Sequence, residues 1–247
     1  MTQNTVEVKN LVKTFGKFRA VDDVSFYIPQ GEIFGLLGPN GAGKTTTIRM
    51  LIGILRPDRG SAHVLGFDVR KKPEEVKKRI GYMSQKFSLY NDLSVRENLD
   101  FYAAIYNDMS ARQRRMRVDE MLERVDLTDM QKSLTRSLSG AWRQRLALAC
   151  SIVHKPKMLF LDEATAGVDP VARRYFWDLI YRLAGEGISV LATTHYMDEA
   201  DYCNTIGMMY QGRLVSLASP DAIKDSLPGV LLQVDVKDPL EVQKVLQ

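Results

Sequence analysis

The sequence predicts an α/β fold with a mainly parallel sheet, an antiparallel β subdomain at the N-terminus and a helical subdomain inserted in the core. Three observations predict it. The N-terminal segment alternates apolar and polar side chains, later apolar runs alternate with helical periods, and a central stretch carries helical periods alone. Continuous apolar strands separated by helices are typical of a parallel sheet that is covered on both faces.

The N-terminal segment predicts strands over residues 5–15 and 19–28, where apolar and polar side chains alternate. A short apolar run at 31–38 follows and ends in a glycine-rich turn, after which residues 44–55 carry helical spacing. A turn at 57–60, which contains proline, aspartate and glycine, ends this unit. The order strand, glycine loop and helix is therefore expected here.

The middle of the chain predicts a helical insert over residues 92–153, preceded by a strand at 79–83. Two apolar strands follow at 157–161 and 188–194, with a helix between them at 173–187. In such sheets ligands bind beyond the carboxyl ends of the strands. The residues that directly follow each apolar strand are therefore the candidates for a functional site.

The pattern changes from Pro220 onward. Residues 229–236 alternate like a strand, and residues 239–247 begin a helix that has no C-terminal cap. We therefore expect a main domain over 1–220 and the start of a small C-terminal extension over 221–247, which belongs to a longer native chain.

The composition, 45% apolar and 26% charged residues, is that of an ordinary soluble globular protein, and a net charge of +4 does not indicate a nucleic-acid partner. We expect the basic cluster at 112–117 to be a solvated helix face. Cys150 and Cys203 lack metal-ligand spacing, so reduced thiols are the simplest interpretation. No apolar run is long enough to cross a bilayer, and the first ten residues contain no apolar signal core.

A phosphate-binding loop follows the first apolar strand, because Gly38 to Thr45 match the pattern G-x-x-x-x-G-K-[ST]. Glycines let successive backbone N–H groups curl around phosphate oxygens, Lys44 adds a positive charge, and the Thr45 hydroxyl is a ligand for Mg²⁺. The expected nucleotide-binding residues are Gly38, Pro39, Asn40, Gly41, Ala42, Gly43, Lys44, Thr45 and Thr46.

Polar residues also follow the other strands. Asp162 stands where a carboxylate holds Mg²⁺, and Glu163 stands where a carboxylate polarises the attacking water. Alone, this pair is more simply two solvated acids in a loop, but a phosphate loop in the same sheet favours the metal-and-base interpretation. His195 is placed to contact a γ-phosphate, and Gln85 to reach Mg²⁺ or the attacking water. Their alternatives are a surface histidine and an ordinary polar loop residue.

Two predicted helix N-termini, at Ser139 and at Asp169, each allow two interpretations. Leu138 to Arg145 read "LSGAWRQR", which is either an ordinary helix capped by Ser139 or a site for an anion at a helix N-terminus. Asp169 and Pro170 predict an N-cap with proline at the first helical position. A cap at Asp169 does not exclude an interface contact there.

The chain resembles the nucleotide-binding subunits of ATP-binding-cassette (ABC) transporters over residues 5–220. The motifs that carry this resemblance stand in the family's order: "GPNGAGKTT", Gln85, "LSGAWRQR", "MLFLDEA", "AGVD" and "TTHYMDEA". The multidrug and antibiotic exporter ATPases are the most similar, on "GVDPVARRYFW" and "TTHYMDEADYC".

The resemblance implies roles that spacing alone does not. Ser139 and Gly140 would contact the γ-phosphate of ATP on the opposite subunit, although Ala141 and Trp142 stand where the family usually has glycine and glutamine. Phe15 would stack on adenine, with Phe18 as its alternative, and Val21 would contribute to the same nucleotide site.

The implied function is a Mg²⁺-dependent ATPase that powers transport, in the export direction, through separate transmembrane permease subunits. One phosphate loop and one signature per chain imply a homo- or heterodimer with two composite sites. Such a subunit is peripheral, at the cytoplasmic face of the inner membrane, and its expected contact with the permease lies beside residues 85–95. The alternatives are an importer ATPase and a soluble ABC protein of repair or translation. A single cassette without coiled-coil or zinc insertions favours a transporter over the soluble proteins.

Overall fold

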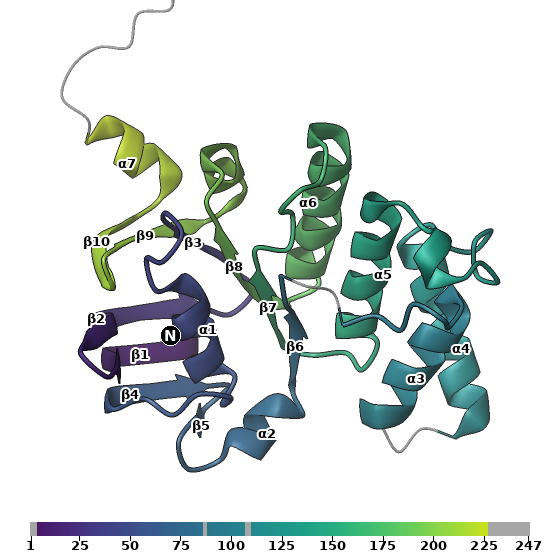
Figure 1. Cartoon of the computed structure of the whole chain (residues 1–247), viewed down its shortest axis with the longest axis horizontal. Coiled ribbons are helices and arrows are strands. Elements are labelled where there is room, and N and C mark those ends of the chain that lie inside the picture. Colours follow the sequence, from purple (N-terminus) through teal and green to yellow (C-terminus); the bar gives the residue numbers. More distant parts are fainter. Residues whose placement is uncertain (1–3, 86–87, 107–109, 227–247) are drawn as a thin grey trace, which may run out of the picture.

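The computed structural model describes residues 4–85, 88–106 and 110–226, which form two sheets and a group of helices (Figure 1). The strands are β1 (Asn4–Phe15), β2 (Phe18–Pro29), β3 (Ile33–Leu37), β4 (Arg59–Val64), β5 (Phe67–Asp68), β6 (Ile80–Met83), β7 (Met158–Asp162), β8 (Ser189–Thr194), β9 (Thr205–Tyr210) and β10 (Arg213–Ala218). The helices are α1 (Lys44–Leu51), α2 (Pro73–Lys77), α3 (Val95–Tyr106), α4 (Ala111–Arg124), η1 (Thr135–Ser137), α5 (Gly140–Ile152), α6 (Pro170–Gly185), η2 (Met197–Tyr202) and α7 (Pro220–Asp225).

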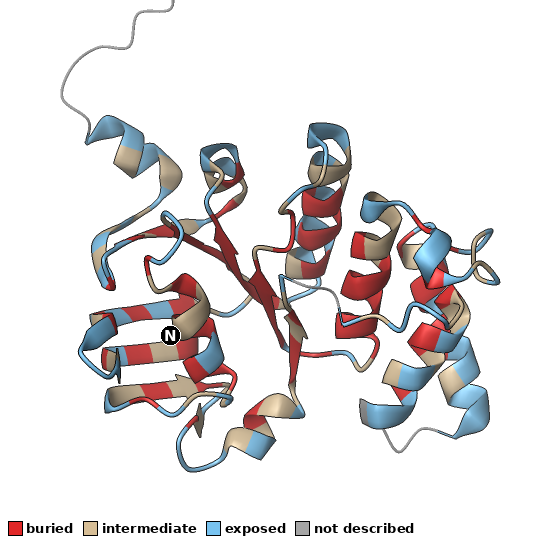
Figure 2. Cartoon of the chain, in the orientation of Figure 1, coloured by how far each residue is buried: buried red, intermediate tan, exposed pale blue. Residues whose placement is uncertain are grey.

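The larger sheet has the strand order β10-β9-β3-β8-β7-β6. All neighbouring pairs in it are parallel except β9 with β10. Every residue of β3, β7 and β8 is buried, as their continuous apolar sequences predict (Figure 2). The parallel pairing brings the carboxyl ends of β3, β6, β7 and β8 to one edge, where the predicted site residues begin.

The smaller sheet is antiparallel, with the order β2-β1-β4-β5. β1 and β2 form a hairpin in which Phe15 pairs with Phe18 across a tight turn. The inward side chains of both strands are buried and pack with α1 and β3 in one core cluster. This confirms the predicted α/β fold class with an antiparallel N-terminal β subdomain.

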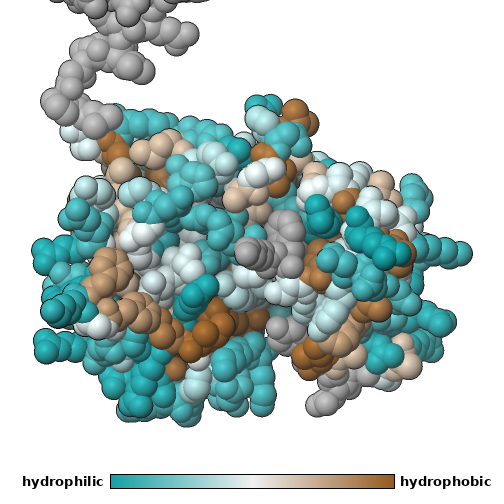
Figure 3. All heavy atoms as spheres, in the orientation of Figure 1, coloured by the Kyte–Doolittle hydropathy of each residue, from teal (hydrophilic) through white to brown (hydrophobic). Residues whose placement is uncertain are grey.

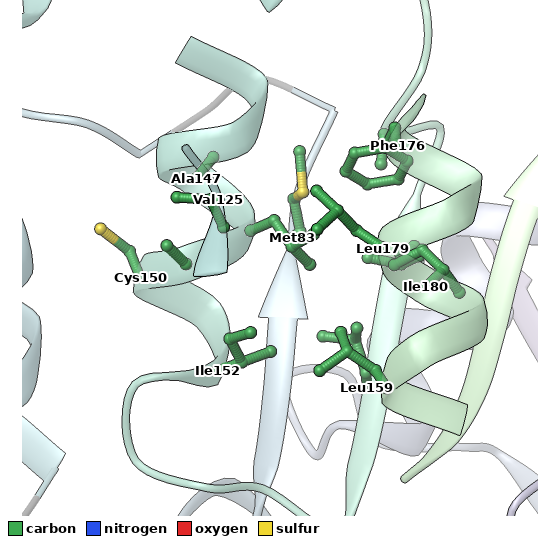
Figure 4. Close-up of a cluster of buried hydrophobic side chains, with 14 of the residues drawn as sticks. Met83, Val125, Ala147, Cys150, Ile152, Leu159, Phe176, Leu179 and Ile180 are labelled. Carbon is green, nitrogen blue, oxygen red and sulfur yellow. The ribbon is translucent and has the colours of Figure 1, made fainter. Parts of the chain in front are cut away.

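Between β6 and β7 the chain is helical, as predicted, and α5 carries the packing between these helices and the sheet. Residues 146–150 of α5 are buried without interruption. Figure 4 shows Met83 of β6 lying between Ala147 and Ile152 of α5 on one side and Leu179 and Ile180 of α6 on the other. The insert and the sheet therefore share one hydrophobic core rather than two.

The expectation of a fully solvated basic face at 112–117 is wrong for one residue. Arg112 and Arg115 are exposed, but Arg117 is only 6% exposed. Its Nε donates to the carbonyl of Val153 (2.7 Å) and its Nη2 to that of Ile152 (3.0 Å). These carbonyls end α5, where helices lack internal donors and carry partial negative charge. Arg117 therefore caps α5 from α4.

Three other expectations meet different outcomes. The helix predicted over 44–55 ends at Leu51, and Gly53 then takes a positive φ of 73°. Cys150 and Cys203 are both described, and they are buried free thiols; burial raises the pKa of Cys203 to about 12. The strand at 229–236 and the helix from 239 lie outside the described residues. Among the described helices, none has the length and apolar character that a membrane span requires.

Arg117→Met tests the capping of α5. The substitution keeps an aliphatic stem but removes the donor to both carbonyls, so we expect the free energy of unfolding to fall by about 2 kcal/mol in urea denaturation. Arg115→Met, on the exposed face of the same helix, is the control and should stay within about 0.5 kcal/mol of the wild type. Equal losses in the two variants would contradict the capping role.

Candidate functional site

The loop between β3 and α1 is shaped by close backbone packing. A Cβ on Gly38 would lie 2.2 Å from the carbonyl oxygen of Met209, and one on Gly43 would lie 2.4 Å from that of Ala20. Gly43 also has a φ of 105°, which side chains other than glycine rarely adopt. Only glycine fits at these two positions. Because Gly43 is the N-cap residue of α1, no side chain covers the amides at the start of this helix.

Lys44 lies inside this loop and is 3% exposed. Its Nζ donates to the carbonyls of Gly38 (2.7 Å) and Pro39 (3.1 Å), and it lies 3.3 Å from Glu163 Oε1. All three of these contacts are with oxygen atoms. They hold the ammonium charge inside the curve of the loop. This arrangement suits an anion with several oxygens.

Asp162 is buried at the end of β7 and accepts two hydroxyl hydrogen bonds at Oδ1, from Thr45 (2.8 Å) and Thr193 (2.9 Å). Tyr82 of β6 also interacts with Asp162, and burial together with that carboxylate raises the Tyr82 pKa, which keeps the phenol protonated. The Thr45 hydroxyl and the Asp162 carboxylate are hard oxygen ligands of the kind that Mg²⁺ takes, so these residues fit the metal. In the part of the chain that is described, no three His, Cys, Asp or Glu side chains form a metal cluster.

Glu163 is where the predicted catalytic residues meet. Its Oε2 accepts from Gln85 Nε2 (3.0 Å) and lies 3.9 Å from His195 Nδ1, while its Oε1 faces Lys44. The backbone of Glu163 has a φ of 50°, and its amide donates to the carbonyl (3.1 Å) and the hydroxyl (3.0 Å) of Thr193. A left-handed conformation costs about 1 kcal/mol in a non-glycine residue, so these two hydrogen bonds hold a strained turn that aims the carboxylate at the phosphate loop.

Lys44, Thr45, Gln85 and Glu163 border a cavity of about 430 Å³, whereas Asp162 and His195 lie outside its lining. It is lined by Phe18, Ala20, Asn40, Gly41, Ala42, Gly43, Lys44, Thr45, Thr46, Gln85 and Glu163. Phe15 lies outside this lining and is 49% exposed at the end of β1, while Val21 is buried in the core. The aromatic ring at the cavity is therefore that of Phe18, the alternative to Phe15.

Ser139 and Gly140 lie at the start of α5 and are exposed. Ser139 is in the N-cap position, but among the described residues its side chain accepts no capping hydrogen bond. A Cβ on Gly140 would meet no described atom within 4 Å. The ordinary capping interpretation thus lacks its hydrogen bond, and the space beside Gly140 at the start of α5 is open. In the next turn of α5, buried Gln144 donates through Nε2 to the carbonyl of Ala164 (2.8 Å), which ties α5 to the loop after Glu163.

Asp169 caps α6 as predicted, accepting from the amides of Val171 and Ala172 with Pro170 at the first helical position. Arg173 follows in the same turn, and no local sequence pattern distinguishes it from the neighbouring Arg174. The Arg173 guanidinium joins the two loops that flank the site, because its hydrogen-bond partners lie on both of them.

Arg173 Nη2 donates to the carbonyl of Val168 (3.4 Å), in the loop after β7, and Nη1 to Asp198 (3.1 Å) after β8. Its Cζ lies 3.9 Å from the ring centre of Tyr196, and Nε lies 3.7 Å from the buried carboxylate of Glu199. The Tyr196 ring in turn lies 4.2 Å from that of His195. Arg173 thus supports the segment that carries His195.

The sequence model described as "ABC transporter" matches residues 21–166. A curated relative, the probable multidrug ABC transporter ATP-binding protein YbhF of Escherichia coli (strain K12), is 46% identical over 222 residues; the match covers 90% of this chain and 38% of YbhF. The chain thus spans well under half of that relative. The daunorubicin/doxorubicin resistance ATP-binding protein DrrA of Streptomyces peucetius is 40% identical, over 94% of this chain and 71% of DrrA.

Solved structures show the same fold. CbiO1 of Clostridium perfringens, described as part of the ABC transporter complex CbiONQ, superposes with a TM-score of 0.84 at 28% identity, over 90% of this chain and 91% of CbiO1. The ATP-binding cassette MJ0796, described as a dimeric post-hydrolysis state bound to ADP and Pi, gives a TM-score of 0.79 at 25% identity, over 87% and 98% of the two chains. From the family match, the identity to DrrA over most of both chains and the shared fold, this chain belongs to the ABC transporter family as one of its ATP-binding proteins.

Proposed function

We propose that this chain binds and hydrolyses ATP, and that the closure of two such subunits around ATP drives export through transmembrane permease subunits. The observation that carries the proposal is the convergence on Glu163. Gln85, Lys44 and His195 all approach its carboxylate at the mouth of the phosphate loop. Family membership supports ATP as the nucleotide.

In this proposal the loop amides and Lys44 hold the β- and γ-phosphates. Thr45 and Asp162, with the Gln85 amide oxygen, would hold Mg²⁺, which neutralises phosphate charge when it is bound. Glu163 accepts a hydrogen bond from a water molecule and directs its oxygen at the γ-phosphorus, while His195 and Gln85 steady the carboxylate and the phosphate. A bond forms between the water oxygen and the γ-phosphorus while the bond from that phosphorus to the bridging oxygen breaks; Glu163 takes one water proton and passes it to the departing phosphate, which yields ADP and inorganic phosphate. We expect Phe18, with Phe15 beside it in the hairpin, to meet the adenine.

A composite site follows from Ser139 and Gly140, which are exposed and lie outside the lining of the cavity of their own chain. Uncapped amides at a helix N-terminus favour an anion, and the γ-phosphate of a second subunit's ATP is the one that the resemblance implies. Each site would then combine the phosphate loop of one subunit with α5 of the other. The MJ0796 dimer, with ADP and Pi, is the structural precedent for two cassettes together.

The permease contact is proposed over α3, next to the segment 85–95. Figure 3 shows apolar side chains, in brown, over the lower end of α3 in this view. Tyr90, Phe101 and Ile105 are 48%, 38% and 59% exposed, and the rings of Tyr90 and Phe101 lie 4.7 Å apart. An exposed apolar cluster of this kind indicates a protein partner. Such a contact would hold the chain at the cytoplasmic face of the inner membrane.

Export rather than import is proposed because YbhF and DrrA are named for multidrug transport and antibiotic resistance. An importer subunit would carry the same catalytic residues, so the site itself does not set the direction. Reconstitution with the permease and measurement of cargo movement relative to ATP is the test of direction. Accumulation of cargo on the side of the ATPase would contradict the proposal.

Glu163→Gln tests the catalytic carboxylate. It keeps the shape of the side chain and removes the proton acceptor, so we expect steady-state ATP turnover to fall by at least about a hundredfold while ATP binding stays near the wild type. Lys44→Ala should instead weaken ATP binding about ten- to hundredfold. Glu123→Gln, an exposed glutamate on α4, is the control. Turnover like that of the wild type in Glu163→Gln would remove Glu163 from the mechanism.

Ser139→Ala tests the composite site. In a Glu163→Gln background, where ATP is not consumed, light scattering should show that Ser139→Ala weakens ATP-driven dimerisation about tenfold or more, while ATP binding to the monomer is unchanged. Ser137→Ala, two residues earlier and exposed, is the control. Ala141→Gly should leave dimerisation unchanged or strengthen it. If Ser139→Ala weakens monomer binding as much as dimerisation, Ser139 does not serve the second subunit.

Arg173→Lys tests the support of His195. Lysine keeps a positive charge near Glu199 but loses the planar stack on Tyr196 and the forked contact with Val168 and Asp198. We expect kcat to fall about tenfold with little change in KM for ATP, because the displaced group acts on the γ-phosphate rather than on nucleotide binding. Arg174→Lys, exposed and adjacent, should behave like the wild type. A change confined to KM would contradict this role.

A further inference from the structure

Trp142 stands at a signature position where the resembled family usually has glutamine, and its surroundings suggest a reason. The Arg145 guanidinium lies against two aromatic rings: its Cζ is 4.3 Å from the ring centre of Trp142 and 3.5 Å from that of Tyr175. The Arg145 side chain is only 15% exposed. A guanidinium stacks readily on aromatic faces, and it does so more strongly where water is excluded.

Asp126 completes this group. The Tyr175 hydroxyl donates to Asp126 Oδ2, and Arg145 Nη1 lies 3.6 Å from the same oxygen. Burial and the hydrogen bond to Asp126 raise the Tyr175 pKa, so the phenol remains a donor. We call Asp126, Trp142, Arg145 and Tyr175 the Arg145 cluster.

The Arg145 cluster joins three helices. Asp126 follows the end of α4, Trp142 and Arg145 belong to α5, and Tyr175 belongs to α6 (Figure 1). Trp142 lies in the first turn of α5, directly before Arg143, whose amide donates to the Ser139 carbonyl (3.0 Å). The cluster therefore acts on the same turn that carries Ser139 and Gly140.

The first turns of α5 thus have two anchors on the core. Gln144 reaches the carbonyl of Ala164, and Arg145 reaches the ring of Tyr175. Gln144 fixes the distance between α5 and the loop after Glu163, because it is one hydrogen bond. With the Arg145 contact as a second anchor, α5 no longer rotates about the Gln144 hydrogen bond. The two contacts together set the direction of the α5 axis.

We propose that Trp142 is a positioning residue: its ring holds the Arg145 guanidinium against Tyr175, and this fixes the direction in which Ser139 and Gly140 face a second subunit. The inference rests on the proposed composite site. Under this proposal tryptophan replaces the glutamine of the family pattern because its ring stacks on Arg145. Glutamine has no ring and would not make that contact. Trp142 acts through Arg145 and lies outside the lining of the cavity of its own chain.

The test uses the chain in a Glu163→Gln background and measures ATP-driven dimerisation by light scattering beside ATP binding to the monomer. Trp142→Leu removes the ring, and we expect it to weaken dimerisation about three- to tenfold with monomer binding unchanged. Trp142→Phe keeps an aromatic face and should retain most of the dimerisation. Tyr175→Leu should resemble Trp142→Leu, while Tyr175→Phe isolates the hydroxyl.

A double variant separates positioning from contact. If both rings act through Arg145, Trp142→Leu with Tyr175→Leu should weaken dimerisation by less than the product of the single effects. Tyr181→Leu is the matched control: Tyr181 lies on α6, is half exposed and faces the ring of Tyr202 instead of α5. It should leave dimerisation unchanged.

The outcomes divide clearly. If Trp142→Leu lowers the melting temperature but dimerises like the parent where it is folded, Trp142 only packs the core and the proposal is wrong. If Tyr175→Leu has no effect while both Trp142 variants lose dimerisation equally, Trp142 contacts the partner directly and the proposal is also wrong. If Ser139→Ala loses dimerisation and Trp142→Leu does not, only the positioning role fails. If Ser139→Ala dimerises like its parent, the composite site is wrong and the positioning role falls with it.

Discussion

Thr193 holds both acidic residues of the site, Asp162 through its carboxylate and Glu163 through its backbone amide. The parallel pairing of β7 with β8 places Asp162 opposite Thr193. The Thr193 hydroxyl donates to Asp162 and accepts from the amide of Glu163, whose amide also reaches the Thr193 carbonyl. A shift of one residue between these strands would turn Thr193 to the other face of the sheet and release both acids. The register of two buried strands therefore sets the position of both acids, whose carboxylates Thr45, Lys44 and Gln85 meet.

Arginine makes the long-range links around this frame. Arg117 joins α4 to the end of α5, Arg145 joins α5 to α6, and Arg173 joins the loops after β7 and β8. Each uses the planar fork of the guanidinium for several contacts at once, and two of them stack on aromatic rings. A lysine at any of the three positions would keep the charge and lose most of these contacts. The helices and loops are thus held to the sheet by directional groups as well as by apolar packing.

The sequence was sufficient to predict the elements whose signal is local. The strands β3, β7 and β8 are continuous apolar runs, and the phosphate loop has a fixed spacing of glycines, lysine and threonine. The strands β9 and β10 were not predicted, because residues 205–218 mix exposed and buried side chains without a clear apolar run. Arg117 was misassigned for a similar reason. Arg112 and Arg115 of the same cluster are exposed, and the contact that sets Arg117 apart is with the end of α5, in another part of the chain. The partners of Arg145 and Arg173 likewise exist only after the helices have packed.

The left-handed backbone at Glu163 limits which substitutions this position tolerates. Asparagine, aspartate and glycine adopt a φ near 50° with little penalty, whereas valine, isoleucine and threonine crowd their branched Cβ against the backbone there. Inactive variants at residue 163 therefore fall into two groups. Members of one group, Glu163→Asn and Glu163→Gly, fold normally and lack only the acid, while members of the other also carry a deformed turn between β7 and α6. A mutational survey scored by protein abundance would respond to the shape of the side chain at residue 163, since shape decides whether the turn forms. It would not respond to the loss of the acid alone.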